Sequence, residues 1–373
     1  MSIGIGELIF GAFACVTLLQ LFYYFGIFGR FAFRKESSFP DNQKQEPVSV
    51  VICAKNEAQN LQKNIPLFFA QNYPEFQVVV VNDCSVDESE DILDEFEKKY
   101  PKLHVVNLKV DEIRDHDKKL ALTLGIKGAK YDLLLLTDAD CMPANENWIA
   151  TMARNFDDRT EIVLGFGAFK KSDGLLNKLI RFDAFFVALQ YLSYSIAKLT
   201  YMGVGRNLAY RKSLFFKHKG FASHYHIQSG DDDLFINGAA TNKNTKIEFS
   251  RNSFTYSEPK KTFRTWVNQK RRHITTAKHY KGIHKFMLAL FSFSSVLFYL
   301  SFIALLILRF QLYAVLTVFL LRMLSQMIIF RKSMVKLDQK DLWWLSFVYE
   351  ILLMLFYPFI FVSNLFVKKH KWK

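Results

Sequence analysis

Two carboxylates, Asp138 and Asp140, directly follow the apolar run of residues 133–137. Such a short run predicts a buried strand, so both side chains lie at its carboxyl end, where open α/β sheets bind ligands. Two acidic side chains separated by one residue can hold Mg²⁺ or Mn²⁺, cations that usually share their coordination with substrate phosphates. An isolated pair of this kind is usually only an acidic turn, so the surrounding elements decide between the two interpretations.

A second acidic cluster, residues 230–233, contains Asp231, Asp232 and Asp233. Adjacent carboxylates repel one another, which raises the pKa of one of them and suits it to act as a general base near neutral pH. The alternative is a solvated acidic loop.

Alternating patterns predict the elements that position these residues. Strand-like runs at residues 48–53, 77–81, 103–108 and 132–137 alternate with helix-like segments at 57–70, 87–99 and 118–130. Repeated β-α units predict a parallel sheet with helices on both faces. Right-handed crossovers would bring the loops 54–57, 82–87 and 138–140 into one crevice. The sequence therefore predicts an α/β domain with a polar pocket at one edge of its sheet.

Other side chains of this crevice also have ligand-binding chemistry. Asp83 could accept a hydrogen bond from a base or a ribose, whereas Asp87 is better explained as the cap of the following helix. Lys118 begins a helix and could meet a diphosphate there, or it could simply be solvated. The cysteines have no metal-ligand spacing.

Four apolar stretches are long enough to cross a hydrocarbon core, which takes about 20 helical residues. They cover residues 5–28, 286–308, 312–330 and 342–367. The first lacks a basic leader and a clear cleavage site, which favours a retained anchor over a signal peptide. Glu350 and Pro358 interrupt the last, which leaves a full span and a re-entrant or interfacial helix pair as alternatives. We expect an integral membrane protein with one N-terminal and two to three C-terminal transmembrane helices.

Basic residues predict how the chain is oriented. Arg30, Arg34 and Lys35 follow the first stretch, and residues 259–285 contain many Lys and Arg but no Asp or Glu. By the positive-inside rule, residues 30–285 then face the cytosol, as in a bacterial-type inner membrane, although the basic tail 368–373 fits this rule only if the last stretch does not cross. The net charge is +14, and the basic residues are concentrated next to the apolar stretches. This placement favours membrane lipids and diphosphates over nucleic acid as partners.

Two further segments have alternative explanations. Residues 175–199 form either a core helix or an amphipathic helix at the membrane surface. Arg322 lies inside an apolar stretch, where a charge is costly unless it is paired. Glu350 is its candidate partner; otherwise both side chains reach toward an interface.

The ordered set of motifs resembles the membrane-associated family 2 glycosyltransferases, which are inverting nucleotide-sugar enzymes of the Rossmann-like GT-A fold. The matching stretches are residues 47–57, 81–85, 118 with 121–122, 138–140, 203–211, 230–233 and 269–273. The resemblance implies a role for each matching residue. The residues implied in donor binding are Ala54, Glu57, Asp83, Lys118, Asp138, Gln269, Arg271 and Arg272, those in metal binding are Asp138 and Asp140, and the general base is Asp232 or, in an alignment shifted by one residue, Asp231. Asn207 and Tyr210 would shape the acceptor side.

The chain departs from the family at one position. Residues 269–273 resemble the Q-x-x-R-W motif of membrane polysaccharide synthases, but His273 stands where those enzymes have tryptophan. An imidazole offers a sugar a smaller stacking face than an indole, which weakens the case for a processive synthase.

The sequence thus predicts three parts: an anchor (1–29), a cytosolic catalytic domain with interfacial segments 175–199 and 259–285 (30–285), and C-terminal membrane helices with a basic tail (286–373). The expected activity is metal-dependent transfer of a sugar from a UDP-sugar to a lipid-linked, glycan or other membrane-proximal hydroxyl acceptor, with Mg²⁺ or Mn²⁺. The alternatives are a processive polysaccharide synthase and a catalytically silent membrane module that binds nucleotide-sugar or lipid.

Overall fold

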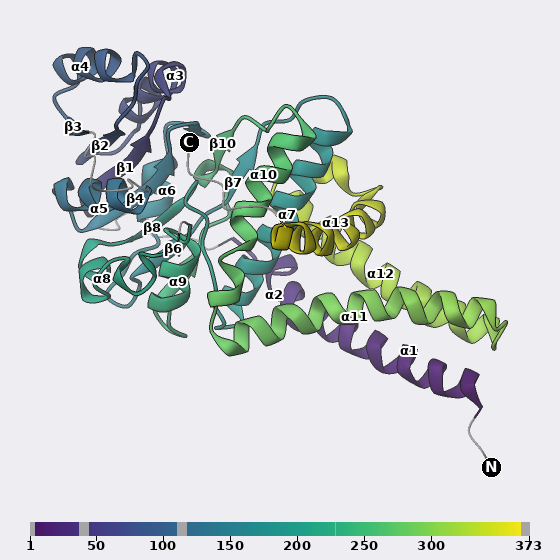
Figure 1. Ribbon diagram of the computed structural model, residues 1–373. Helices are drawn as coiled ribbons and strands as arrows, with labels where there is room; N and C mark the ends of the chain where they lie inside the picture. The colour runs from purple at the N-terminus through teal and green to yellow at the C-terminus, as the bar shows by residue number, and fades with distance from the viewer. Residues whose placement is uncertain (1–3, 37–44, 110–117, 228, 367–373) are drawn as a thin grey trace.

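A seven-stranded sheet forms the centre of the larger part of the molecule (Figure 1). The computed structural model describes residues 4–36, 45–109, 118–227 and 229–366; the basic tail 368–373 lies outside them. The strand order is β3-β2-β1-β4-β8-β6-β9. The strands are β1 (Val48–Ala54), β2 (Phe76–Asp83), β3 (Leu103–Leu108), β4 (Leu133–Asp138), β6 (Ile162–Leu164), β8 (Leu208–Arg211) and β9 (Thr245–Ile247).

The first four strands of this sheet are parallel, as the alternating pattern predicts. Their helices are α3 (Ala58–Phe69), α4 (Ser89–Lys99) and α5 (Lys118–Gly128), followed by α6 (Trp148–Ala153). Val50 and Ile52 of β1 pack into the cluster formed with α3, α4 and α6, whereas Val51 and Cys53 pack against α5. Both faces of the strand are therefore buried, which explains its uninterrupted apolar sequence.

The other half of the sheet is mixed, which the sequence pattern did not predict. Strand β8 runs antiparallel to both β4 and β6, and β6 pairs with β9 in parallel. A small second sheet, in the order β5-β10-β7, consists of β5 (Cys141–Pro143), β7 (Gly167–Phe169) and β10 (Thr255–Ser257). Because β5 begins one turn after β4, the segment with Asp138 and Asp140 joins the two sheets.

Helices connect this domain to an apolar bundle. The helices after β7 are α7 (Leu175–Ile196), α8 (Lys212–Lys217), α9 (Asp233–Ala239), α10 (Phe263–Ile274), α11 (Gly282–Ile307), α12 (Leu312–Lys336) and α13 (Ser346–Phe366). The N-terminal helix consists of α1 (Ile5–Leu21), a π-helical segment (Phe22–Phe28) and α2 (Gly29–Ala32). Helix α7 is a core helix, since Phe182, Phe185 and most of its other side chains are buried.

Four helical segments of the described chain are long and apolar enough to cross a membrane: Ile5–Ala32, Gly282–Ile307, Leu312–Lys336 and Ser346–Asn364. In Figure 1, α1, α11 and α12 extend together away from the sheet domain. This finding confirms one N-terminal apolar helix and gives three at the C-terminal end.

Helix α13 differs from the other three in its position. It is one continuous helix with Pro358 inside it, so the alternative of a helix pair is wrong. Figure 1 shows it beside α7 and α10, which belong to the sheet side of the molecule. The Phe356 ring stacks on Trp266 of α10 with centroids 4.5 Å apart, and Arg271 of α10 donates to Ser363 at 3.2 Å. The second half of α13 therefore packs on α10.

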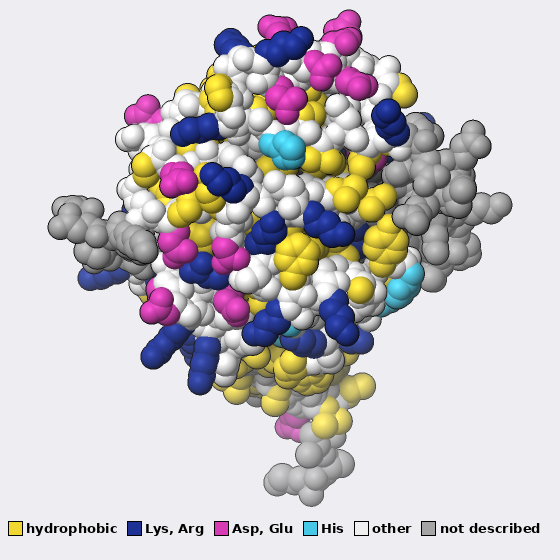
Figure 2. Space-filling view, turned by 90° about the vertical axis from the view of Figure 1, so that its left-hand side faces the viewer, with side chains coloured by type: hydrophobic (Ala, Val, Ile, Leu, Met, Phe, Trp, Pro, Cys, Tyr) yellow, Lys and Arg dark blue, Asp and Glu magenta, His cyan; other side chains and the backbone are white. Residues whose placement is uncertain are grey.

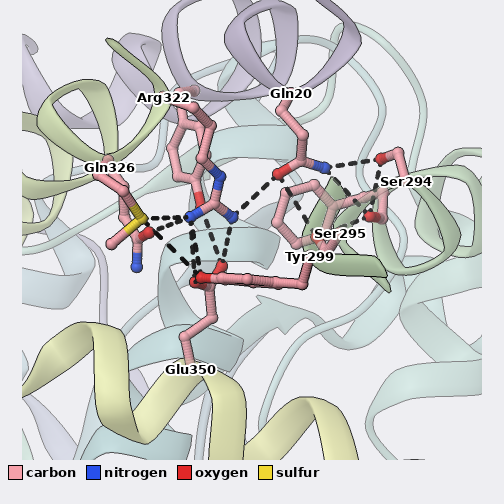
Figure 3. A network of polar contacts seen from close by, with 10 residues as sticks. Gln20, Ser294, Ser295, Tyr299, Arg322, Gln326 and Glu350 are labelled. Atoms are coloured by element: carbon pink, nitrogen blue, oxygen red, sulfur yellow. Dashed lines mark hydrogen bonds and ion pairs between the residues drawn. The ribbon is translucent and has the colours of Figure 1, made fainter. Parts of the chain in front are cut away.

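A buried polar network joins the apolar helices (Figure 3). The Arg322 guanidinium, 0% exposed, forms an ion pair with Glu350 at 2.9 Å, which confirms the partner predicted from the sequence. Gln20 of α1 accepts a hydrogen bond from Arg322 at 3.1 Å and donates to Ser294 of α11 at 2.6 Å. Tyr299 of α11 donates to Glu350 at 3.1 Å. The charges of α12 and α13 are thus compensated by side chains from all four helices.

We expect Glu350→Leu to lower the free energy of unfolding by about 3–5 kcal/mol, because it leaves Arg322 buried without its counter-charge. The double variant Arg322→Met/Glu350→Leu should lose less than the single variant, since no unpaired charge remains. Denaturant unfolding in detergent micelles measures both. Equal stability of the wild type and the single variant would show that the pair does not stabilise the bundle.

Candidate active site

The loops after β1 and β2 are held together by hydrogen bonds between them. The backbone N–H of Asn56 donates to Ser85 Oγ at 2.9 Å, and the N–H of Val86 donates to Asn56 Oδ1 at 2.9 Å. Asp87 accepts from the N–H groups of both Ala58 and Ser89, at 3.1 Å each. Its carboxylate therefore binds the amino ends of α3 and α4, a wider capping role than the sequence predicted. The two loops form one rigid wall of the crevice.

Asp83 lies at the end of β2 and is 0% exposed. Lys55 Nζ is 3.6 Å away, but neither carboxylate oxygen has a hydrogen-bond partner in the described part of the chain. Buried polar atoms are normally paired, so this carboxylate has the capacity to accept hydrogen bonds from a bound molecule.

The turn between β4 and β5 brings together three potential metal ligands. One ligand atom each from Asp138, Asp140 and Cys141 lie within 4.8 Å of one another. Burial, together with the Asp138 charge, raises the pKa of Asp140, a shift that a cation would reverse. The sequence predicted the two carboxylates, but the spacing of the cysteines gave no signal for Cys141.

Lys118, at the first residue of α5, connects this turn to the second acidic cluster. Its Nζ lies 2.8 Å from Asp138 Oδ1 and 3.0 Å from Asp231 Oδ2. The two clusters, 93 residues apart in sequence, therefore meet at one ammonium group. Although burial lowers the pKa of Lys118, Asp138 and Asp231 outweigh it and hold this pKa well above its usual value. The lysine stays charged and offsets the repulsion between the two clusters.

Asp231 and Asp232 differ in environment. Lys118 outweighs the effect of burial and lowers the pKa of Asp231. Burial and the charges of Asp231 and Asp233 raise the pKa of Asp232 to about 7. The Asp232 carboxylate accepts hydrogen bonds from the N–H groups of Gly205 and Asp233, each at 2.7 Å. Gly230, with φ of 103°, makes the turn into this segment in a backbone conformation that favours glycine.

One pocket is lined by Asp138 of the first acidic cluster and by Asp231 and Asp232 of the second. It is lined by Val51, Cys53, Lys118, Leu122, Leu136, Thr137, Asp138, Gly205, Leu208, Asp231 and Asp232. Asp138 of the acidic turn, Lys118 and a carboxylate with a raised pKa thus line one pocket, and side chains of these types can bind a phosphate ester and accept a proton.

Two cations near the turn were not among the predicted site residues. Arg206 and Lys260 both act on Asp140 by lowering its pKa. The Arg206 guanidinium stacks over Phe169 at 4.2 Å, and Lys260 also lowers the pKa of Glu57, although burial raises it overall. Lys260 belongs to the basic segment 259–285 and Arg206 to the motif 203–211, but no spacing rule identifies either as a site residue.

Other predicted residues lie elsewhere. Ala54 is fully buried, so only its backbone can face a ligand. Gln269, Arg271 and Arg272 lie on α10, half-buried, and the Arg271 guanidinium contacts Ser363 of α13. No ion pair joins Arg271 to a site carboxylate within the part of the chain that the structure describes. Donor binding by Arg271 would therefore require it to leave this position.

Asn207 and Tyr210, which the resemblance places on the acceptor side, are not among the residues that line the pocket. Both are 0% exposed. The Asn207 amide donates to the carbonyl oxygens of Phe166 and Ser253 and accepts from Trp148 Nε1, so it holds the core together.

The fold is that of a GT-A-like glycosyltransferase domain. A mannosyltransferase from Pyrobaculum calidifontis, PcManGT, superimposes on 91% of this chain and 99% of its own, with a TM-score of 0.53 and 16% identity. Residues 49–218 match the family Glycosyl transferase family 2. The part of the chain that contains the turn between β4 and β5 therefore matches this family model.

Two curated relatives extend this comparison. The probable glycosyltransferase YdaM of Bacillus subtilis is 26% identical over 244 residues, which are 62% of this chain and 56% of YdaM. A poly-β-1,6-N-acetyl-D-glucosamine synthase of Staphylococcus epidermidis is 31% identical over 100 residues, which are 27% of this chain and 23% of the synthase. The chain thus matches only about half, or less, of these relatives' lengths.

Proposed function

We propose that the protein transfers a sugar from a nucleotide-sugar to a hydroxyl acceptor with inversion at the anomeric carbon. The observation that carries this proposal is the position of Lys118, which contacts Asp138 and Asp231 at 2.8 and 3.0 Å. It brings the proposed donor site and the proposed base into one pocket, as a single displacement requires.

A nucleotide-sugar donor with a divalent cation fits the residues present. Asp138 and Asp140 supply hard oxygen ligands, and Cys141 adds a sulfur atom to the same group. PcManGT was solved with GDP-mannose and Mn²⁺, which supports the same class of donor and either Mg²⁺ or Mn²⁺ here. When bound, the cation would offset the negative charge that develops on the leaving diphosphate.

The remaining roles fall to side chains of this pocket. Asp83, whose carboxylate oxygens have no hydrogen-bond partner in the described part of the chain, and Glu57 would hold the nucleoside, and we propose uridine as that nucleoside. Lys118, together with Arg206 and Lys260, would bind the diphosphate as cations.

Asp232 would remove the proton from the acceptor hydroxyl as its oxygen attacks the anomeric carbon. A buried carboxylate with a pKa of about 7 suits this role better than the ion-paired Asp231. With the base bound to Gly205 N–H and Asp233 N–H, its position is fixed before the acceptor arrives.

A lipid-linked or other membrane-proximal acceptor is proposed because the acidic cluster lies close to the apolar helices. Figure 2 shows Lys and Arg side chains over the lower part of the sheet domain, next to the apolar end of the molecule. Lys278, Lys281 and Lys285 are exposed around the start of α11, where anionic headgroups would meet them. We retain the proposed division at residues 29 and 285, with residues 30–285 in the cytosol.

Single transfer is favoured over processive synthesis by the packing of the bundle. Gln20, Arg322 and Gln326 are 0% exposed and fill the space where the apolar helices meet (Figure 3). A polymer leaving through the membrane would need that space.

The test is to incubate the purified protein with membrane lipid extract, Mn²⁺ and either UDP-N-acetylglucosamine, UDP-glucose or GDP-mannose, and to measure release of UDP or GDP and product size. One added sugar supports the proposal. A ladder of long products would favour a synthase, and donor binding without turnover would favour the silent module.

The transfer rate is expected to increase as the pH is raised through about 7 and to be lost as the pH is lowered through the same value. Only the ionised Asp232 can accept the proton, and its pKa is raised to about 7, so the ionised fraction is lost as pH falls through that value. A profile of kcat/KM between about pH 5 and 9 measures this rise on the acid side, called here the acidic limb. A limb near the ordinary aspartate pKa of about 4 would contradict the assignment.

A further inference from the structure

The helix that follows the acidic cluster, α9, is bound through one face to the segment that leads into the first C-terminal apolar helix. Asp233 and Asn237 are four residues apart, so their side chains lie on the same face of α9. This face of α9 lies against residues 276–284, here called the junction segment. The segment ends in the first turn of α11.

Asp233 makes the first set of contacts. One carboxylate oxygen accepts hydrogen bonds from Thr276 Oγ1 and, at 2.6 Å, from Tyr280 Oη. The other accepts from the Leu234 N–H at 2.7 Å. Asp233 is 7% exposed, and burial raises its pKa, whereas the hydrogen bonds from Thr276, Tyr280 and the Leu234 N–H act in the opposite direction because they favour the ionised form.

Asn237 makes the second set, one turn further along α9. Its Oδ1 accepts from the Lys281 N–H at 3.0 Å, and its Nδ2 lies 3.0 Å from His284 Nδ1. The same Nδ2 donates to the Tyr201 carbonyl at 2.7 Å. Two turns of α9 are therefore bound to the start of α11 by buried hydrogen bonds, which are costly to break singly.

We propose that Asp233 is a positioning residue that fixes Asp232 relative to the membrane helix α11 through Thr276 and Tyr280. The inference rests on the proposed role of Asp232 as the base. Because Asp232 and Asp233 are adjacent, and the Asp233 N–H donates to the Asp232 carboxylate at 2.7 Å, a shift of the junction segment would move the base.

The charge of Asp233 gives this role a signature that packing alone would not give. The groups that act electrostatically with Asp232 are Asp231, Asp233, Lys118, Tyr191 and Tyr210. Asp233 acts on it as a like charge and raises its pKa. Loss of that charge lowers the pKa of Asp232, so the base stays ionised to lower pH.

The experiment uses the full-length protein in detergent micelles, with the variants Asp233→Asn, Tyr280→Phe and the double variant. Thermal unfolding should show that the double variant loses less than the sum of the two single losses, because both variants weaken the same contact: Tyr280→Phe removes the donor, and Asp233→Asn replaces the charged acceptor with a neutral amide. This arm needs no donor. Additive losses would overturn the contact as a coupling between α9 and the junction segment.

The second part of the experiment measures the release of UDP or GDP from UDP-N-acetylglucosamine, UDP-glucose and GDP-mannose with Mn²⁺ as a function of pH. Tyr280→Phe should lower kcat by about tenfold or more with the donor KM unchanged, since the base is displaced and the donor site is not. Asp233→Asn should shift the acidic limb to lower pH. Asn237→Ala is the matched control, because it removes neighbouring hydrogen bonds without a charge and should leave the limb in place.

An unchanged kcat in Tyr280→Phe together with an unmoved limb in Asp233→Asn would overturn the positioning role. If the wild type releases UDP or GDP from none of the three donors, the proposed function itself fails on those donors. The unfolding comparison then decides the coupling alone, with additive losses against it and non-additive losses in its favour.

Discussion

Asp232→Asn is expected to lower the rate of sugar transfer by about 10²–10⁴, the contribution of a well-placed general base. The amide keeps an oxygen that can accept the Gly205 N–H but can no longer take up a proton. Steady-state kinetics with the donor identified by the panel described above would measure this, and the donor KM should change little, because the lesion affects the transition state more than donor binding.

Asp231→Asn is the informative comparison. It removes an ion pair to Lys118 at 3.0 Å and a like charge that raises the pKa of Asp232, so it should weaken binding of the diphosphate and shift the acidic limb of the pH profile to lower pH without removing it. Asp158→Asn makes the same chemical change at an exposed position and should leave the rate unaltered. If Asp231→Asn gave the larger loss of kcat and also removed the acidic limb, Asp231 would be the base. If both site variants stayed within a few-fold of wild type, neither would be.

Asp140→Asn is expected to abolish stimulation by Mg²⁺ and Mn²⁺ and to reduce transfer by about 10³, equivalent to losing about 4 kcal/mol of transition-state stabilisation. Asp140 and Asp138 are the two carboxylates of the ligand group after β4. A neutral amide at either position removes a charged ligand. The measurement is a metal titration of the rate after chelation and removal of bound cations.

The wild type serves as the control for the metal titration. Its activity should disappear with chelator and return with Mn²⁺, whereas Asp140→Asn should not recover at any accessible concentration. Wild-type activity that persists in excess chelator would contradict a divalent requirement.

Strong local patterns explain which parts of the site could be predicted from the sequence. Strand β1 is buried at every residue, and β2 and β4 are buried at all residues but one, so each is an apolar run whose end marks a loop of the pocket. Because Asp83, Asp138 and Asp140 lie at or just after such strand ends, their place in the site could be predicted. The ion pair between Arg322 and Glu350 followed from the cost of a lone charge in an apolar helix.

What could not be predicted depends on contacts distant in sequence. Strands β6 and β9 have only three residues each, too few for a periodic signal, so the mixed half of the sheet was missed. Arg206 reaches the site because the motif that contains it packs beside β10. The burial of Asn207 has the same origin: the polar motif residue completes hydrogen bonds inside the core instead of facing a ligand.

The contacts of α10 show a similar limit. Arg271 and Arg272 were expected to bind a diphosphate, but Arg271 contacts α13, and the neighbouring Lys270 forms an ion pair with the buried Asp183 of α7. Only the packing of three helices, which no local pattern encodes, assigns these cations to structural partners.

The central claim is that a divalent cation and a nucleoside diphosphate bind together at the turn between β4 and β5. Electron paramagnetic resonance of Mn²⁺ with UDP or GDP and the full-length protein tests it most directly. We predict phosphorus hyperfine coupling to protein-bound Mn²⁺ that is lost in Asp138→Asn/Asp140→Asn and kept in Asp232→Asn. An unchanged Mn²⁺–diphosphate signal in the double variant would contradict the claim.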